Sequence, residues 1–339
     1  GDSHAIVAEV NDFLTAHAND WRATWLQGLA KALKSTWQPS FGRALLIGVG
    51  QYANPQMPSL RGPANDIALV EALLIEHFSF DPNQIIRLQD KKATRQAILA
   101  ALKTLHTAAQ PSDTVVIWFS GHAINQQSPA YLLPFDYDGT TGQQSISADE
   151  LHQHLLDIPA AHKVVVLDTH VQQRLLELVG QDNGYTLCLA ENGPAGQAQE
   201  LPIEGHIYGL FSYEMIQALK RQPKATLEDI EQAVTQAIEE RVASRQVPLF
   251  IGNKARPLIG ESDWQLYVDA FRTAQRQNYA ALTLAELQAM EKRFSPLMTI
   301  PYPPLFHSLG RGYIEKDAFA QALATLNNAR MQAKKIGYV

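Results

Sequence analysis

The stretch VVVLDTHVQQ, residues 164–173, joins an apolar run to an abrupt polar end. Its first four residues favour a buried strand; Asp168 follows directly, and His170 comes two positions later. A second stretch, DTVVIWFSGHA, has the same form and ends with Ser120 and His122. Reactive side chains in open α/β sheets gather beyond the carboxyl ends of the strands. We therefore expect these polar residues to meet at one edge of a sheet.

The rest of the chain alternates short apolar or β-branched runs with longer segments of helical period. This alternation is typical of a mostly parallel sheet that helices cover on both faces. The runs predict an open, doubly wound α/β sheet with the strands Arg43–Gly50, Gln84–Leu88, Asp113–Ser120, His162–Asp168, Tyr185–Ala190 and Val247–Gly252. The helical segments predict helices at Ala64–His77, Thr94–Thr107, Ser147–Leu156, Leu210–Arg221 and Leu227–Ala243. The last of these helices follows a predicted capping box, in which Thr226 and Asp229 exchange hydrogen bonds.

Composition divides the chain into three parts. Residues 1–42 are expected to form a helical arm with an apolar stripe, residues 43–260 hold the predicted sheet, and residues 261–339 form a helical extension. Within the extension, the proline-rich segment TIPYPPLF, residues 299–306, predicts a turn. We expect the arm and the extension to pack together or against the central part, so that the protein is a monomer or an assembly built through those helices.

The bulk properties exclude several classes of function. The chain has 339 residues and a formal net charge of -6, and its basic residues form no stripe, so we expect neither a nucleic-acid partner nor a membrane partner. No apolar run approaches the roughly 20 residues that cross a bilayer. A single cysteine, Cys188, rules out an internal disulfide framework and a zinc site with several thiolates, which suits a cytoplasmic protein.

Five segments in order carry a family resemblance: RALLIGVGQYANPQMPSLRGPANDIALVEALLIEHFSF, VVIWFSGHA, YLLPFDYD, VVVLDTH and GHIYGLFSYEMIQAL. Together they resemble the caspase-type domain of bacterial and plant metacaspases and their relatives, over residues 43–260. The resemblance implies a caspase-like fold, with a six-stranded, mostly parallel sheet between helices. In active members of the family it also implies a Cys/His dyad that cleaves peptide bonds.

The resemblance assigns both dyad positions. The family pattern YSGHG falls on FSGHA, which makes His122 the acid and base of the dyad. The pattern DSCHSG falls on DTHVQQ, which puts His170 where the nucleophilic cysteine stands. An imidazole does not replace a thiolate in this chemistry, and Val171–Gln173 and Ala123 depart from the pattern as well. We therefore predict a pseudopeptidase without activity, which binds a peptide or protein partner or regulates an active homologue.

The resemblance also implies a substrate pocket. Metacaspases hold a Lys or Arg side chain with acidic groups, and these groups map onto Asp66 and Asp168, with Ser120 nearby. Each aspartate has an alternative structural role. Asp66 could stabilise the helix that begins near Ala64, and Asp168 could cap the segment after its strand. Both roles are compatible with a partner that carries a Lys or Arg anchor.

Two alternatives describe a working hydrolase. A peptidase with an unusual nucleophile would need Thr169 or Cys188, but the hydroxyl of Thr169 should point away from His170, and Cys188 lies in the middle of a predicted strand. A metal-dependent enzyme would use His122, His170 and Asp168 as ligands for zinc or another divalent ion. Nothing in the sequence fixes the geometry of these three side chains, so we expect no metal and no cofactor. The remaining histidines are interpreted as surface residues, among them His152, His154 and His162.

Overall fold

The computed structural model describes residues 41–125, 130–139, 144–169, 178, 184–190, 199–242, 248–260, 282–294 and 303–335. The predicted arm, apart from residues 41 and 42, lies outside these described residues. Residues 41–262 belong to one compact unit, and the helices after residue 282 belong to a second one.

The first unit is built on a six-stranded sheet with the order β11-β8-β7-β3-β1-β2. Its strands are β1 (Gly42–Gly48), β2 (Ile85–Gln89), β3 (Thr114–Ser120), β7 (His162–Asp168), β8 (Thr186–Leu189) and β11 (Leu249–Ile251). All neighbours run parallel except β11, which is antiparallel to β8. The prediction of a mostly parallel six-stranded α/β sheet is confirmed.

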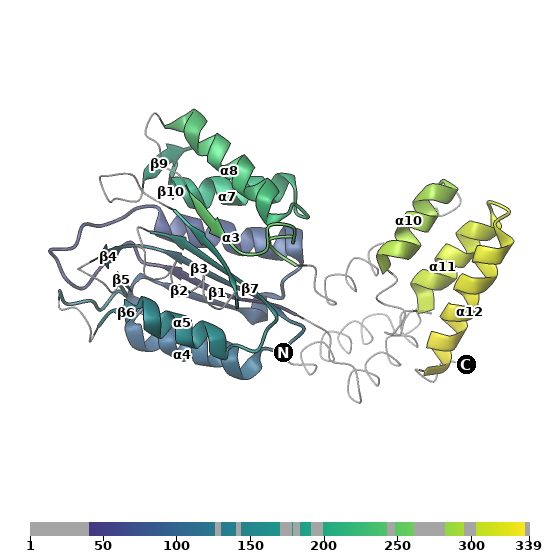
Figure 1. Ribbon diagram of the computed structural model, residues 1–339, viewed down its shortest axis with the longest axis horizontal. Helices are drawn as coiled ribbons and strands as arrows, with labels where there is room; N and C mark the ends of the chain where they lie inside the picture. The colour runs from purple at the N-terminus through teal and green to yellow at the C-terminus, as the bar shows by residue number, and fades with distance from the viewer. Residues whose placement is uncertain are drawn as a thin grey trace. The chain divides into compact units, whose positions relative to one another are not determined.

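Helices cover both faces of this sheet (Figure 1). One face packs against α3 (Pro63–Phe78), α7 (Leu210–Arg221) and α8 (Leu227–Arg241), and the other against α4 (Arg95–Ala108) and α5 (Ala148–Asp157). Successive strand residues alternate between the two cores: Val164 and Val166 face the first set of helices, and Val165 and Leu167 face the second. Burial on both faces explains why the strand runs are continuously apolar.

All five predicted helices are present, with ends shifted by a few residues. The predicted capping box is confirmed: the Thr226 hydroxyl accepts the backbone N–H of Asp229 at 3.2 Å, and the Asp229 carboxylate accepts the backbone N–H of Thr226 at 2.9 Å. Asp229 thus replaces the usual Glu at the third helical position, and α8 begins at Leu227 as predicted.

Two small antiparallel sheets were not predicted. One holds β4 (Ala123–Asn125), β5 (Ala130–Leu132) and β6 (Ile146–Ser147). The other is a hairpin of β9 (Glu200–Ile203) and β10 (His206–Gly209). Glu204 and Gly205 form its two-residue turn, with φ angles of 49° and 84° that suit the twist of a tight hairpin. This hairpin reaches the candidate site described below.

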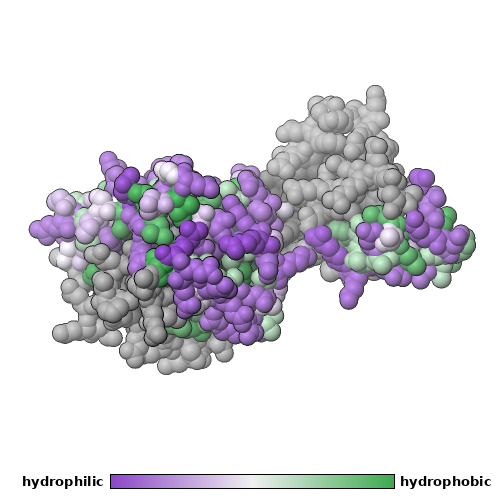
Figure 2. Space-filling view, turned by 90° about the horizontal axis from the view of Figure 1, so that it is seen from above, coloured by the Kyte–Doolittle hydropathy of each residue, from purple (hydrophilic) through white to green (hydrophobic). Residues whose placement is uncertain are grey.

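The described part of the second unit contains α10 (Leu284–Phe294), α11 (Pro303–Ile314) and α12 (Phe319–Lys335). The prediction of a turn at residues 299–306 is wrong from Pro303 onward, where α11 begins. Prolines fit the first turn of a helix, because the N–H groups at that position make no hydrogen bond within the helix. Apolar side chains reach the surface of this unit (Figure 2), including Ile314, Phe319, Leu323 and Met331. None of the described helices is long and apolar enough to span a bilayer.

Candidate functional site

The polar ends of β3 and β7 lie side by side, as the sequence predicts. Ser120, the last residue of β3, is the register partner of Asp168, the last residue of β7. Asp66 joins them from the first turn of α3. All three side chains are buried, with exposed fractions of 3%, 2% and 0% for Ser120, Asp168 and Asp66. The sheet edge and the start of α3 therefore bring two carboxyl groups into one enclosed place.

The side chain of Asp66 is hydrogen bonded to residues of other elements. The Ser120 hydroxyl donates to Oδ2 of Asp66 at 2.7 Å, and the backbone N–H of Gly209 donates to Oδ1 at 2.9 Å. Burial raises the pKa of Asp66 well above its ordinary value, and the charge of Asp168 raises it further. The two hydrogen bonds act in the opposite direction, because they stabilise the charged form.

Asp168 links the end of β7 to α7. Its Oδ2 accepts the backbone N–H of Ser212 at 3.0 Å, in the first turn of that helix. The Ser212 hydroxyl in turn accepts the indole N–H of Trp118 at 3.0 Å. Burial raises the pKa of Asp168 to about 6, although its hydrogen bonds with Ser212 lower it. The described geometry places this carboxylate at the start of α7, whereas the sequence alternative placed it at the segment after β7.

These residues line a small pocket together with a third acid that the sequence analysis missed. The pocket is bounded by Leu60, Pro63, Asp66, Ser120, Gly121, Asp168, Glu200 and Gly209. Its volume of about 10 Å³ holds roughly one water molecule. A Cβ on Gly209 would lie 2.2 Å from Oδ2 of Asp168, so only glycine allows this approach. Among the residues that the structure describes, three acids and no basic residue line the pocket, which favours a cationic guest.

Glu200 comes from β9 and contacts the start of α3. Its Oε1 accepts the backbone N–H groups of Arg61 at 2.7 Å and Gly62 at 2.5 Å. Gly62 is the N-cap of α3, and its backbone N–H, which the third helical residue accepts in a capping box, is accepted here by Glu200 from a distant part of the chain. No local pattern predicts this contact, because 138 residues separate Glu200 from Gly62.

His122 follows β3 and is held by the loop between β1 and α3. Its Nε2 lies 2.8 Å from the backbone oxygen of Pro58, and its backbone N–H donates to the Tyr52 hydroxyl at 2.7 Å. The rings of His122 and Tyr52 pack with their centroids 5.3 Å apart. A carbonyl oxygen only accepts, so Nε2 carries the proton and Nδ1 is left as the basic nitrogen. Burial lowers the pKa of His122, which favours the neutral base.

His170 lies outside the described residues, as do Val171–Gln173. The predicted position of His170 in the dyad therefore stays a prediction, as does its role in the alternative metal site with Asp168. Among the described residues, no group of three or more His, Cys, Asp or Glu side chains is arranged to hold a metal ion.

The two alternative nucleophiles are buried. Thr169 is 1% exposed. Cys188 lies inside β8 with no exposed surface, and burial raises the pKa of its thiol. A thiol of this kind is neither deprotonated nor accessible at neutral pH, so it behaves as an apolar core residue.

Comparison with known proteins agrees with this architecture. Residues 41–258 match the family model described as Caspase domain. Metacaspase-1 of Scheffersomyces stipitis is 33% identical over 86 residues, which cover 24% of this chain and 21% of that protein. Metacaspase-1 of Mycosarcoma maydis is 32% identical over 124 residues, which cover 32% of this chain and 30% of that protein. The matches thus span less than a third of the length of either relative. The solved structure of pro-sf-caspase-1 is 13% identical, with 65% of this chain and 94% of that chain covered and a TM-score of 0.44.

Proposed function

The chain belongs to the caspase-domain family, and from that premise we propose that it is a pseudopeptidase that binds a peptide or protein segment through a Lys or Arg side chain. The proposed loss of catalysis rests on the position of the single cysteine. Cys188 is the only cysteine among 339 residues, and it lies wholly buried inside β8. Active members of the family cleave peptides with a thiolate, and this chain offers no thiolate that a substrate could reach.

The position of His122 agrees with its predicted role as the base of the dyad. His122 is oriented by Tyr52 and Pro58 and presents a neutral Nδ1. A general base without a nucleophile transfers no acyl group, since no bond to the substrate carbon forms. The orientation of His122 also supports the second candidate, a hydrolase that uses a different nucleophile or a bound metal ion. The test below includes both.

The acidic pocket supports the binding role. Asp66, Asp168 and Glu200 line it, and their pocket has room for roughly one water molecule. An incoming ammonium or guanidinium would pair with carboxylates in a desolvated setting, where charge-assisted hydrogen bonds are strong. The guest needs more space than the pocket offers, so we expect the β9–β10 hairpin to move when a basic side chain enters. A single cysteine and a net charge of -6 suit a cytoplasmic setting for this role.

The test uses the full chain and a peptide library in which one position is Lys, Arg or the neutral arginine isostere citrulline. Binding is measured by fluorescence polarisation and cleavage by mass spectrometry, each with and without divalent metal. We expect binding that needs the positive charge, and no cleavage under either condition. Metal-dependent or metal-independent cleavage would establish the hydrolase instead. Equal binding of arginine and citrulline peptides would remove the pocket from the proposal.

The variant D168N and the control E204Q sharpen this experiment. Both remove one negative charge, but Asp168 lines the pocket, whereas Glu204 is exposed at the hairpin turn. Weaker binding in D168N and unchanged binding in E204Q is the expected pair of results, because only one of the two charges faces the guest. An equal effect of both would indicate a general electrostatic attraction.

A further inference from the structure

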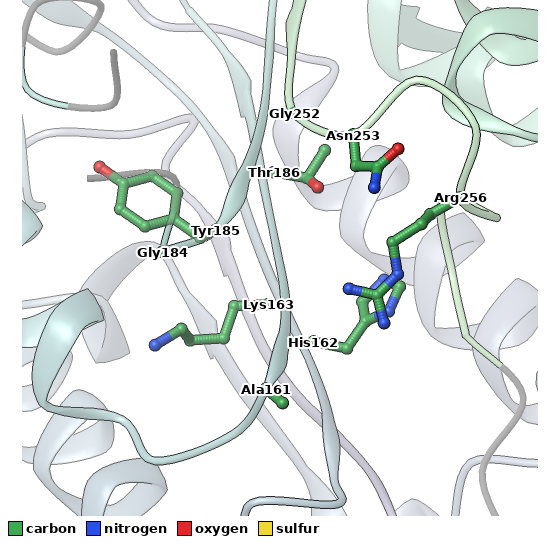
Figure 3. A pocket seen from close by; sticks show the side chains of 9 residues that line it. All are labelled: Ala161, His162, Lys163, Gly184, Tyr185, Thr186, Gly252, Asn253 and Arg256. Carbon is green, nitrogen blue, oxygen red and sulfur yellow. The ribbon is translucent and has the colours of Figure 1, made fainter. Parts of the chain in front are cut away.

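A larger cavity lies at the opposite edge of the sheet from the acidic pocket. It is formed at the amino ends of β7 and β8 and in the turn after β11 (Figure 3). Its volume is about 350 Å³, which falls in the range of small-ligand sites. The lining residues are Ala161, His162, Lys163, Gly184, Tyr185, Thr186, Gly252, Asn253 and Arg256. None of them lines the acidic pocket, so this cavity is separate from the proposed peptide site.

The lining residues that the structure describes carry positive charge and include no acid, although the chain as a whole has a net charge of -6. Lys163 is 7% exposed, and its ammonium donates to the backbone oxygen of Ile158 at 2.8 Å, at the end of α5. Within the part of the chain that the structure describes, neither Lys163 nor Arg256 has a carboxylate partner. An arginine without a carboxylate partner at a concave surface leaves a favourable place for an anion.

The backbone that carries Arg256 is fixed. Its carbonyl oxygen accepts the backbone N–H of Leu227 at 2.8 Å, at the first residue of α8, and its own N–H donates to the oxygen of Asn253 at 3.1 Å. The guanidinium extends from this anchored turn toward His162, as Figure 3 shows. A guanidinium on a fixed backbone loses less conformational freedom when it binds a ligand.

His162 and the neutral polar residues complete the cavity. The Nε2 of His162 lies 2.9 Å from the backbone oxygen of Leu258, so the ring is held, and burial lowers its pKa, which keeps it neutral. His162 was predicted to be a surface residue and is partly buried, because the first residue of β7 packs against the segment after β11. Asn253 uses its Oδ1 to accept the N–H of Ala255, which leaves its amide N–H groups as donors.

We propose that this cavity binds a small anion through a carboxylate or phosphate group, with Arg256 as its charged contact and Thr186 and Asn253 as neutral donors. Both kinds of group offer compact oxygen acceptors to a guanidinium. Lys163 adds positive charge from the other side of the strands, as Figure 3 shows. The proposal uses no residue of the acidic pocket and does not depend on peptide binding.

The test titrates the full chain with inorganic phosphate and, separately, with acetate, against chloride at the same ionic strength. Affinity is measured by calorimetry, and the site is located by the NMR signals of the His162 ring. We expect at least one of the two anions to bind and to shift those signals. Binding of phosphate alone or of acetate alone names the group that the site prefers. Absence of binding by both would overturn the proposal.

Three variants locate the contact. R256Q removes the guanidinium from an exposed position, so the fold is preserved, and we expect roughly tenfold or greater loss of affinity. T186V keeps the shape of the side chain and removes the hydroxyl, for which we expect a smaller loss. R221Q removes an exposed arginine at the end of α7, outside the cavity lining, and should change nothing. Equal affinity in the wild type and R256Q, or equal losses in R256Q and R221Q, would contradict the assignment.

Discussion

The contact of Glu200 with the start of α3 makes a prediction that is independent of any ligand. Replacing Glu200 by Ala removes the acceptor of two backbone N–H groups, those of Arg61 and Gly62. A hydrogen bond to a charged group contributes about 1.5–3 kcal/mol, but water replaces part of this at Arg61, which is exposed. We take about 2 kcal/mol for the pair, which corresponds to roughly a 30-fold change in an opening equilibrium.

Amide hydrogen exchange measures this opening directly. We expect protection of the Gly62 amide to fall roughly 30-fold in E200A. In E200Q the amide oxygen still accepts both bonds and only the interaction of the charge with the helix dipole is lost, about 0.3–1 kcal/mol, so protection should fall by less than about sixfold. E204Q removes an exposed acid of the same hairpin and should leave the exchange unchanged. Unchanged Gly62 protection in E200A would refute the capping role.

Further predictions concern the nucleophile, the pocket and the domain. H170C should not create robust peptidase activity, because neighbouring residues also differ from the active pattern; rapid cleavage of an arginine peptide by this single variant would show that only the nucleophile is missing. D66N or D168N should weaken binding of a Lys or Arg peptide by about 2–5 kcal/mol, measured by calorimetry, and indifference to both would return these aspartates to a purely structural role. Asp168 also predicts a pH dependence. Its pKa is raised to about 6 in the fold, so its contribution to stability is complete below the unfolded value near 3.9 and is lost as the pH rises through about 6. The thermal midpoint of D168N should therefore rise relative to the wild type between about pH 4 and slightly above about pH 6, and a constant difference across this window would contradict the raised pKa. If the terminal helices stabilise the protein, residues 43–260 alone should differ from the full chain in stability or in assembly state by light scattering; identical behaviour would rule this out.

The sequence predicts the large sheet because each strand is buried on both faces. A run such as VVVLD has no polar position to interrupt it, and the polar residue that ends it marks the sheet edge. The same logic placed Ser120 and Asp168 together, as their register confirms. The hairpin of β9 and β10 was missed because its strands have four residues each and are only half buried, so they lack the continuous apolar pattern.

The other features that the sequence does not predict depend on contacts between distant segments of the chain. Glu200 and the two groups that hold His122, Tyr52 and Pro58, are residues of ordinary appearance in loops or a short strand. Their roles depend on where the fold brings them, 64 and 70 residues from His122 in the case of Pro58 and Tyr52. His152 illustrates the converse error, because it was expected at the surface and is 3% exposed in α5, beside Tyr185.

The hydrogen bonds of the two buried aspartates can be compared with those that a neutral asparagine would make. Asp66 joins α3 to Ser120 and Gly209, and Asp168 joins β7 to α7 through Ser212. An asparagine at position 168 could still accept the N–H of Ser212, and it would avoid the cost of burying a charge, which raises both carboxyl pKa values. At position 66 an asparagine would offer one acceptor oxygen where Asp66 uses two. The hydrogen bond therefore explains an acceptor at position 168, but it does not explain the negative charge there. The proposed cationic guest would explain it, because only the carboxylate form would pair with a cation, and the pairing would lower the pKa that burial has raised.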